Sequence, residues 1–236
     1  MSMAASERLR ALLCEVIRRE AVDHVIETGT YRGLGSTTFV SEAFPGESPP
    51  TRFVTIEANY LNWLAARSNL RRFPFVTPVW GGTVSTERAL SFILTDAVLK
   101  DTQAYPDIYI DDTEDPVAFY TREIKGRLGG RAGYLKHLLR WPVDRLHAYA
   151  GENLLEKYLT AFQANNPLVI LDSAGGIGFL EFSIVETSLR DHRYLLLLDD
   201  INHIKHFRSY RHVKADPRFE VLGVDEREGW LLAKHA

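Results

Sequence analysis

Residues 22–43 constrain the fold of this chain most, because they predict a buried strand that turns through glycines directly into a helix. Residues 22–27 have the length and apolar character of a short strand, and a helix is expected from Ser36 to about residue 43. The turn holds three glycines, where a missing Cβ permits positive φ angles and close approach of a ligand: Gly29, Gly33 and Gly35. The start of the helix offers unpaired N–H groups and a positive dipole end, which suit a carboxylate or a phosphate.

Strands and helices alternate through most of the chain. Such alternation is typical of a parallel sheet with helices on both faces. The last two predicted strands flank a short polar turn, so we expect them to form an antiparallel hairpin. The predicted strands cover residues 22–27, 52–57, 76–80, 168–172, 194–198, 219–224 and 230–234, and helices are expected near residues 6–20, 61–70, 178–190 and 203–213. The predicted fold class is therefore α/β, with a doubly wound, mostly parallel seven-stranded sheet.

A long insertion separates the third and fourth predicted strands. The gap is far longer than one crossover helix needs, and helices at about 86–99 and 152–163 fill only part of it. We therefore expect a single domain over residues 1–236 with an insertion at about 101–150. The insertion begins acidic and then turns basic and aromatic, with basic residues at Arg122, Lys125, Arg127, Arg131, Lys136, Arg140 and Arg145. Three interpretations stay open: a lid that meets an anionic acceptor, a homodimer interface, and an inert surface.

Composition excludes several classes of protein. The net charge of −3 gives no reason to expect a nucleic-acid partner. The only cysteine, Cys14, cannot form an internal disulfide, so nothing indicates an oxidising compartment. No stretch of about 18 apolar residues predicts a membrane-spanning helix, and the first ten residues do not resemble a signal peptide. A cytoplasmic protein without membrane contact is expected.

The glycine turn and two glutamates predict the kind of cofactor. The spacing Gly-x-x-x-Gly-x-Gly differs from the dinucleotide fingerprint, and Glu27 directly before it would repel a pyrophosphate. The same carboxylate would attract an ammonium or a sulfonium group. Glu57, at the end of the second strand, is placed to accept hydrogen bonds from both ribose hydroxyls of an adenosine. These features favour S-adenosylmethionine over NAD.

Residues 25–33 together with Thr55, Ile56 and Glu57 resemble motifs I and II of the Rossmann-like class I S-adenosylmethionine-dependent methyltransferases. The closing hairpin resembles the reversed last strand of that class. The resemblance covers about residues 1–83 and 166–236 and implies a Rossmann-like fold. It implies the cofactor-binding residues Glu27, Thr28, Gly29, Thr30, Tyr31, Gly33, Ser36, Glu57 and Gly82.

Three carboxylates follow the fourth and fifth predicted strands, where ligands of open α/β sheets bind: Asp172, Asp199 and Asp200. Converging carboxylates repel one another unless a cation lies between them, and a hard ion such as Mg²⁺ takes oxygen ligands. Their pattern resembles metal-dependent small-molecule O-methyltransferases, including the macrolide-sugar type. The glycine-rich residues 173–178 depart from that pattern. The alternative is that these aspartates cap the helices that follow, without a metal.

The expected reaction is transfer of a methyl group to a hydroxyl of a small-molecule acceptor. His203 and His206 are spaced to project from one helix face, and His206 has a free pKa suited to a general base. Asp172, His203 and His206 are therefore the candidate catalytic residues. Three alternatives stay open: an NAD-dependent oxidoreductase, a different reaction on the same fold as in cephalosporin-hydroxylase-like proteins, and a non-catalytic adenosine-binding protein.

Overall fold

A seven-stranded sheet forms the centre of the computed structural model, which describes residues 3–46, 48–111, 113–126, 149–173 and 175–236. The strand order is β3-β2-β1-β4-β5-β7-β6, and every pairing among β1 to β5 is parallel. Strand β7 pairs antiparallel with both β5 and β6. The strands are β1 (His24–Thr28), β2 (Arg52–Glu57), β3 (Val76–Trp80), β4 (Pro167–Leu171), β5 (Tyr194–Leu198), β6 (Phe219–Asp225) and β7 (Trp230–His235). The predicted sheet and its reversed C-terminal hairpin are confirmed.

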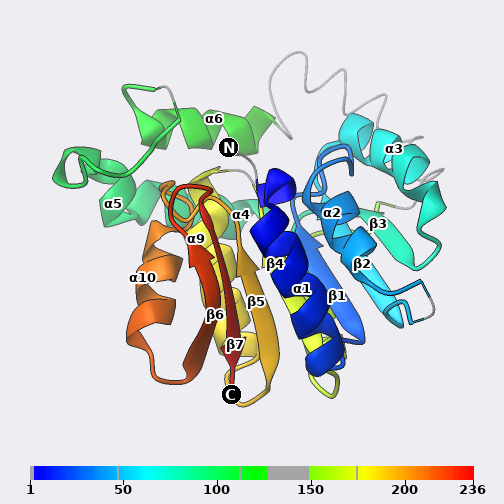
Figure 1. Cartoon of the computed structure of the whole chain (residues 1–236). Helices are drawn as coiled ribbons and strands as arrows, with labels where there is room; N and C mark the ends of the chain where they lie inside the picture. Colours follow the sequence, from blue (N-terminus) through cyan, green and yellow to red (C-terminus); the bar gives the residue numbers. More distant parts are fainter. Residues whose placement is uncertain (1–2, 47, 112, 127–148, 174) are drawn as a thin grey trace.

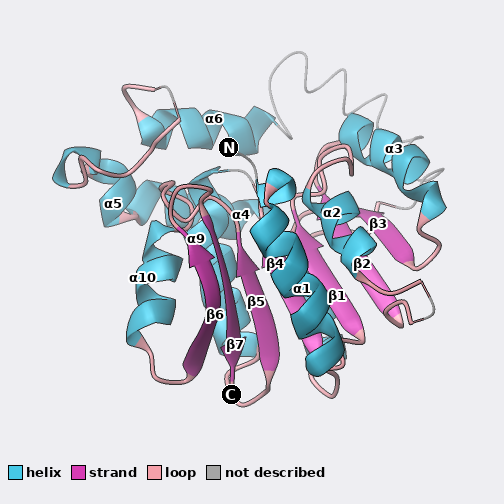
Figure 2. Cartoon of the chain, in the orientation of Figure 1, coloured by secondary structure: helices cyan, strands magenta, loops and turns pink. Residues whose placement is uncertain are grey.

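Helices cover both faces of this sheet, because successive side chains of each central strand point to opposite faces (Figure 2). Val25 packs into a core with α1, α2 and α3, whereas Ile26 packs into a second core with α4, α8, α9 and α10. The helices are α1 (Glu7–Arg19), α2 (Ser36–Ala43), α3 (Tyr60–Asn69), α4 (Thr86–Thr95), α8 (Leu154–Phe162), α9 (Gly178–Ser188) and α10 (Phe207–Ala215). In the part of the chain described, none is long and apolar enough to cross a membrane.

The first part of the insertion lies along the edge of the sheet where the parallel strands end (Figure 1). It follows directly after α5 (Ala97–Lys100) and contains a 3-10 turn (Thr102–Ala104) and α6 (Pro116–Gly126), and α6 packs on α4. Backbone hydrogen bonds join this part to the loop after β5, since Tyr109 N donates to Asn202 O and Ile204 N donates to Tyr109 O, both at 2.9 Å. Five of the seven basic residues fall in 127–148, outside the described residues. The lid, interface and surface interpretations therefore stay predictions.

Candidate functional site

A cleft of about 590 Å³ lies at the carboxyl ends of the parallel strands. Its lining comes from the carboxyl ends of five strands and the segments that follow them: Gly29 after β1, Glu57 at the end of β2, Thr83 after β3, Asp172 after β4 and Lys205 after β5. Helix α6 adds Glu123. Gly82 lies in a smaller neighbouring hollow of about 40 Å³, which shares Ala58, Thr83 and Ile177 with the cleft. Chain segments far apart in sequence therefore converge on one site of ligand size.

The glycine turn forms one wall of the cleft through backbone contacts. Gly29 has a φ of +84°, and a Cβ placed there would lie 2.3 Å from the carbonyl oxygen of Asp172. Only glycine therefore lets the turn after β1 lie this close to the segment after β4. Gly33 also has a positive φ, and its Cβ would meet the side chain of Leu70. The turn is therefore bounded on one side by Leu70, directly after α3, and on the other by the segment that follows β4.

Glu57 binds the glycine turn and the start of α3 together. Its Oε2 accepts a hydrogen bond from Tyr31 N, and its Oε1 accepts one from Asn59 N, both at 2.7 Å. Asn59 then caps α3 by accepting hydrogen bonds from the N–H groups of Leu61 and Asn62. The carboxylate that the sequence assigns to ribose binding is thus held in a fixed place on the cleft wall.

Glu27 lies beneath the glycine turn and is fully buried. Its Oε2 accepts hydrogen bonds of 2.6 Å from the hydroxyls of Thr37 and Thr55, and the hydroxyl of Thr30 joins Thr55 at 2.5 Å. Its Oε1 has no hydrogen-bond partner among the described residues. Burial raises the pKa of Glu27 to about 7, although these threonine hydroxyls work against the shift. Glu27 therefore braces the turn from below and is not part of the cleft lining.

Thr28 and Ser36 are also buried. The hydroxyl of Thr28 accepts a hydrogen bond of 3.3 Å from Asp172 N, which fastens the end of β1 to the end of β4. Ser36 is the first residue of α2, and the N-cap residue of this helix, Gly35, has no side chain that could accept a hydrogen bond from the first turn. Of the predicted cofactor residues, Gly29, Tyr31 and Glu57 line the cleft, whereas Glu27, Thr28 and Thr30 support it from beneath.

The raised pKa of Glu27 predicts a pH-dependent stability. A carboxyl with a folded pKa above its ordinary value of 4.5 stabilises the fold fully below pH 4.5, and this contribution is lost as the pH rises to about 7. One pKa unit corresponds to about 1.4 kcal/mol, so the loss amounts to roughly 3 kcal/mol. Glu27→Gln imitates the protonated carboxyl and should remove this slope. We expect denaturant titrations from pH 4.5 to 8 to show a fall in the free energy of unfolding that is smaller by roughly 3 kcal/mol in the variant than in the wild type, because the raised pKa of Asp199 contributes equally in both proteins.

Glu220→Gln is the matched control, because Glu220 is an exposed glutamate in β6. This variant should keep the pH dependence of the wild type. Parallel slopes for Glu27→Gln and the wild type would contradict the burial of an ionisable carboxyl at position 27.

Asp172, Asp199 and Asp200 converge as the sequence predicts, and each offers a carboxylate oxygen within 4.8 Å of the others. Burial, with the neighbouring Asp172 and Asp200, raises the pKa of Asp199 to about 8. Burial also raises the pKa of Asp172, although Lys205 works against that shift. Asp172 lines the cleft, whereas Asp199 is buried behind it and Asp200 is half-exposed.

Lys205 also lies in this cluster, although no motif in the sequence pointed to it. Its Nζ lies 2.7 Å from Asp200 Oδ2 and 3.3 Å from Asp172 Oδ1, so an ammonium already lies among the carboxylates predicted to bind Mg²⁺. Burial alone would lower the pKa of Lys205, but Asp172 and Asp200 outweigh it and raise the pKa. A divalent ion bound to the same oxygens would be repelled by this ammonium. The three carboxylates offer the oxygen ligands that Mg²⁺ prefers, but the ammonium of Lys205 already compensates part of their negative charge.

The two predicted histidines do not share a helix face, because α10 begins at Phe207 and both histidines precede it, with His203 in an isolated bridge to Tyr109. His203 Nδ1 accepts a hydrogen bond from Lys205 N at 3.2 Å, and its Nε2 lies 3.6 Å from Asp111 Oδ2. His206 is fully buried, with Nδ1 3.4 Å from Ser209 Oγ. Burial lowers the pKa of both imidazoles. Neither ring lines the cleft, so Asp172 is the one of the three predicted catalytic residues that lies in the cleft lining.

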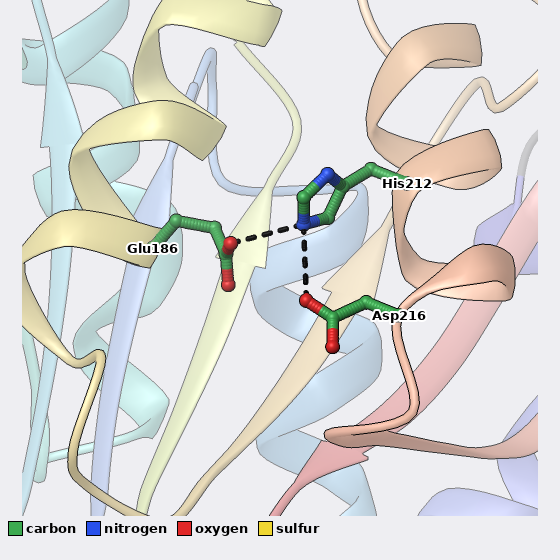
Figure 3. Close-up of side chains that lie close together, drawn as sticks. All are labelled: Glu186, His212 and Asp216. Carbon is green, nitrogen blue, oxygen red and sulfur yellow. Dashed lines mark ion pairs between the residues drawn. The ribbon is translucent and has the colours of Figure 1, made fainter.

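A second cluster with metal-ligand chemistry joins α9 to the end of α10 (Figure 3). His212 Nε2 lies 3.0 Å from Glu186 Oε2 and 3.4 Å from Asp216 Oδ2. The guanidinium of Arg218 pairs with both carboxylates, 3.1 Å from Glu186. The cluster is thus already an ion-pair network, and it connects two helices to the start of β6.

Solved structures with the same fold support the predicted architecture. An O-methyltransferase from Bacillus cereus, solved with S-adenosylhomocysteine, aligns with 14% identity over 98% of this chain and 82% of its own, at a TM-score of 0.50. A candidate O-methyltransferase from Klebsiella pneumoniae aligns with 13% identity over 100% and 83%, also at 0.50. A scan of protein-family models and a search of curated proteins gave no match. The likenesses confirm the Rossmann-like fold.

Proposed function

We propose that this chain is an S-adenosylmethionine-dependent methyltransferase that methylates a hydroxyl of a small molecule. One observation carries the proposal: the Gly29 turn and the Glu57 carboxylate lie on the wall of one cleft at the ends of β1 and β2. This arrangement suits an adenosine with an amino-acid tail. The glycine lets the ligand approach the backbone closely, and the carboxylate can accept hydrogen bonds from the ribose hydroxyls. Two solved structures of the same fold, from Bacillus cereus and Klebsiella pneumoniae, are described as O-methyltransferases, the first with the demethylated cofactor bound.

The chain's own residues would bind and orient both ligands. Glu57 is pre-positioned by two backbone N–H groups, so it meets the ribose without a further loss of side-chain freedom. Asn59 and Asn62 add amide groups to the same wall. S-adenosylmethionine, when bound, supplies a methyl group on a sulfonium, which is transferred in line to a nucleophilic oxygen. Holding the two reactants in line can supply about 7–11 kcal/mol of the barrier reduction in favourable cases.

Asp172 is the group proposed to take the proton from the acceptor hydroxyl. It lines the cleft, and its carboxylate is held by the Lys205 ammonium. Charged residues among the described lining are Glu57, Glu123, Asp172 and Lys205, which together do not attract an anion. The prediction of an anionic acceptor therefore depends on basic residues in 127–148, outside the described part. We infer a small-molecule acceptor, with α6 as the part of a lid that reaches the cleft through Glu123.

Calorimetry with S-adenosylmethionine, S-adenosylhomocysteine and NAD tests the cofactor assignment. Binding of the first two, without NAD binding, is expected, and selective binding of NAD would overturn the proposal. Transfer of a labelled methyl group to a panel of small hydroxyl compounds tests the reaction. Size-exclusion chromatography with light scattering tests the predicted homodimer.

Glu57→Ala should weaken S-adenosylmethionine binding by roughly 1.5–3 kcal/mol, which is the range for hydrogen bonds to a charged group. The truncation also frees Tyr31 N and Asn59 N, so part of the loss comes from a looser turn. Calorimetry measures the change, and Glu123→Ala is the control, since Glu123 lines the same cleft from α6. A folded Glu57→Ala protein with the affinity of the wild type would contradict the ribose assignment.

A further inference from the structure

Lys205 is a buried lysine at the floor of the proposed acceptor site. Its side chain is only 7% exposed, yet it lines the cleft and pairs with Asp172 and Asp200. An ammonium has three N–H donors, and two of them suffice for these two carboxylates. The ammonium therefore has a third N–H group beyond these two ion pairs. A lysine is rarely buried unless it is paired, so this position needs an explanation beyond surface solvation.

The backbone on both sides fixes Lys205 in this place. Its own N–H donates to His203 Nδ1, and the preceding N–H of Ile204 donates to Tyr109 O in the insertion. On the other side, a Cβ at Gly178 would lie 2.7 Å from Lys205 O, so the start of α9 packs directly on this segment. The backbone of Lys205 is therefore held in place beside the carboxylates with which its ammonium pairs.

We propose that the ammonium of Lys205 does in this protein what a divalent ion does in metal-assisted methyl transfer. It compensates the charge of the converging aspartates and holds the reacting oxygen of the acceptor in the cleft. This inference rests on the proposed function and names the residue that makes a metal unnecessary. The Mg²⁺ prediction from the sequence is its direct alternative, since both cations would use the same carboxylate oxygens.

The transfer step balances without a metal. The acceptor oxygen forms a bond to the methyl carbon as the sulfur–carbon bond breaks, and the bonding pair leaves on sulfur to give neutral S-adenosylhomocysteine. The acceptor proton passes to Asp172. Lys205 donates a hydrogen bond to the oxygen and keeps its own proton throughout, so no redox partner or second reactant is required.

The wild-type protein tests the inference first, without any substitution. After dialysis against a chelator, Mn²⁺ titration followed by electron paramagnetic resonance should show no site tighter than about 1 mM. Methyl transfer in chelator should equal that with added Mg²⁺ within a factor of two. A tight one-to-one Mn²⁺ site, or turnover lost in chelator and restored by Mg²⁺, would overturn the inference. The Mn²⁺ measurement does not depend on methyltransferase activity. Failure of the proposed function would instead appear as a lack of S-adenosylmethionine binding, so the two failures can be told apart.

Variants test the ammonium itself. Lys205→Met should lower turnover at least 100-fold with S-adenosylmethionine affinity within tenfold, and Lys205→Ala should regain turnover with added methylamine. Lys205→Ala should also gain a Mn²⁺ site, because the carboxylates lose their built-in cation. Lys157→Met, at an exposed position in α8, is the matched control and should behave as the wild type. A folded Lys205→Met protein with full turnover would contradict the inference, and if the variants do not fold, the wild-type experiments decide.

Discussion

Asp172→Asn is expected to lower turnover by about 10²–10⁴-fold, the range for removal of a general base. Among the three converging aspartates, Asp172 alone lines the cleft. Asparagine keeps the shape and can still accept a hydrogen bond from Lys205, but its amide cannot take a proton from a hydroxyl. S-adenosylmethionine affinity should stay within about tenfold, or roughly 1.4 kcal/mol. Steady-state kinetics of methyl transfer and calorimetry on the same preparation measure the two effects.

Asp200→Asn is the matched control for this prediction. Asp200 is the other partner of Lys205, but it is half-exposed and lies outside the cleft lining. Its φ of +54° suits asparagine, which tolerates the left-handed region, so the backbone should not change. Turnover should fall less than tenfold. Equal losses in the two variants would show that charge near Lys205, rather than proton acceptance by Asp172, limits the reaction.

The sheet was predictable because each strand combines a distinct apolar run with a turn signal. The predicted strands at residues 52–57, 76–80 and 194–198 match β2, β3 and β5 residue for residue. The start of α10 was not predictable in the same way. Ile201, Ile204 and Phe207 have the spacing of a helix, but Asp200 adopts a positive φ and Ile204 pairs with Tyr109 of the insertion. A contact from a segment about 95 residues away thus overrides the local periodicity.

The same distinction separates the site residues that sequence reasoning found from those that it missed. Strand-end carboxylates converge because parallel strands share one edge, and the register of β4 with β5 brings Asp172 and Asp199 together. The position of Lys205 depends on the conformation of the loop between β5 and α10, which the spacing of residues in the sequence does not predict. Glu27 was assigned to the cofactor from its charge and its position before the glycine turn. Because side chains alternate along a strand, Glu27 lies on the same face of the sheet as Val25, toward α2. There the hydroxyl of Thr37 donates a hydrogen bond to its carboxylate.

Gly29→Ala is expected to destabilise the fold by roughly 2–5 kcal/mol, the sum of a left-handed backbone penalty and an overpacked contact. The φ of +84° disfavours any side chain, and the new Cβ would lie 2.3 Å from Asp172 O. Because that oxygen belongs to backbone, the ends of β1 and β4 would have to separate. This separation would widen the cleft at the glycine turn, so S-adenosylmethionine affinity should fall as well. Denaturant unfolding followed by tryptophan fluorescence, with calorimetry of the cofactor, measures both.

Gly46→Ala is the control for the effect of an added methyl group. A Cβ at Gly46 would meet nothing within 4 Å, and this glycine has no positive φ. Its stability should therefore stay within about 0.5 kcal/mol of the wild type, as for most surface substitutions. The difference between the two variants isolates the close approach of the glycine turn to β4. If Gly29→Ala unfolds at the same denaturant concentration as Gly46→Ala, the turn does not have this conformation, and the cofactor wall proposed here loses its main structural support.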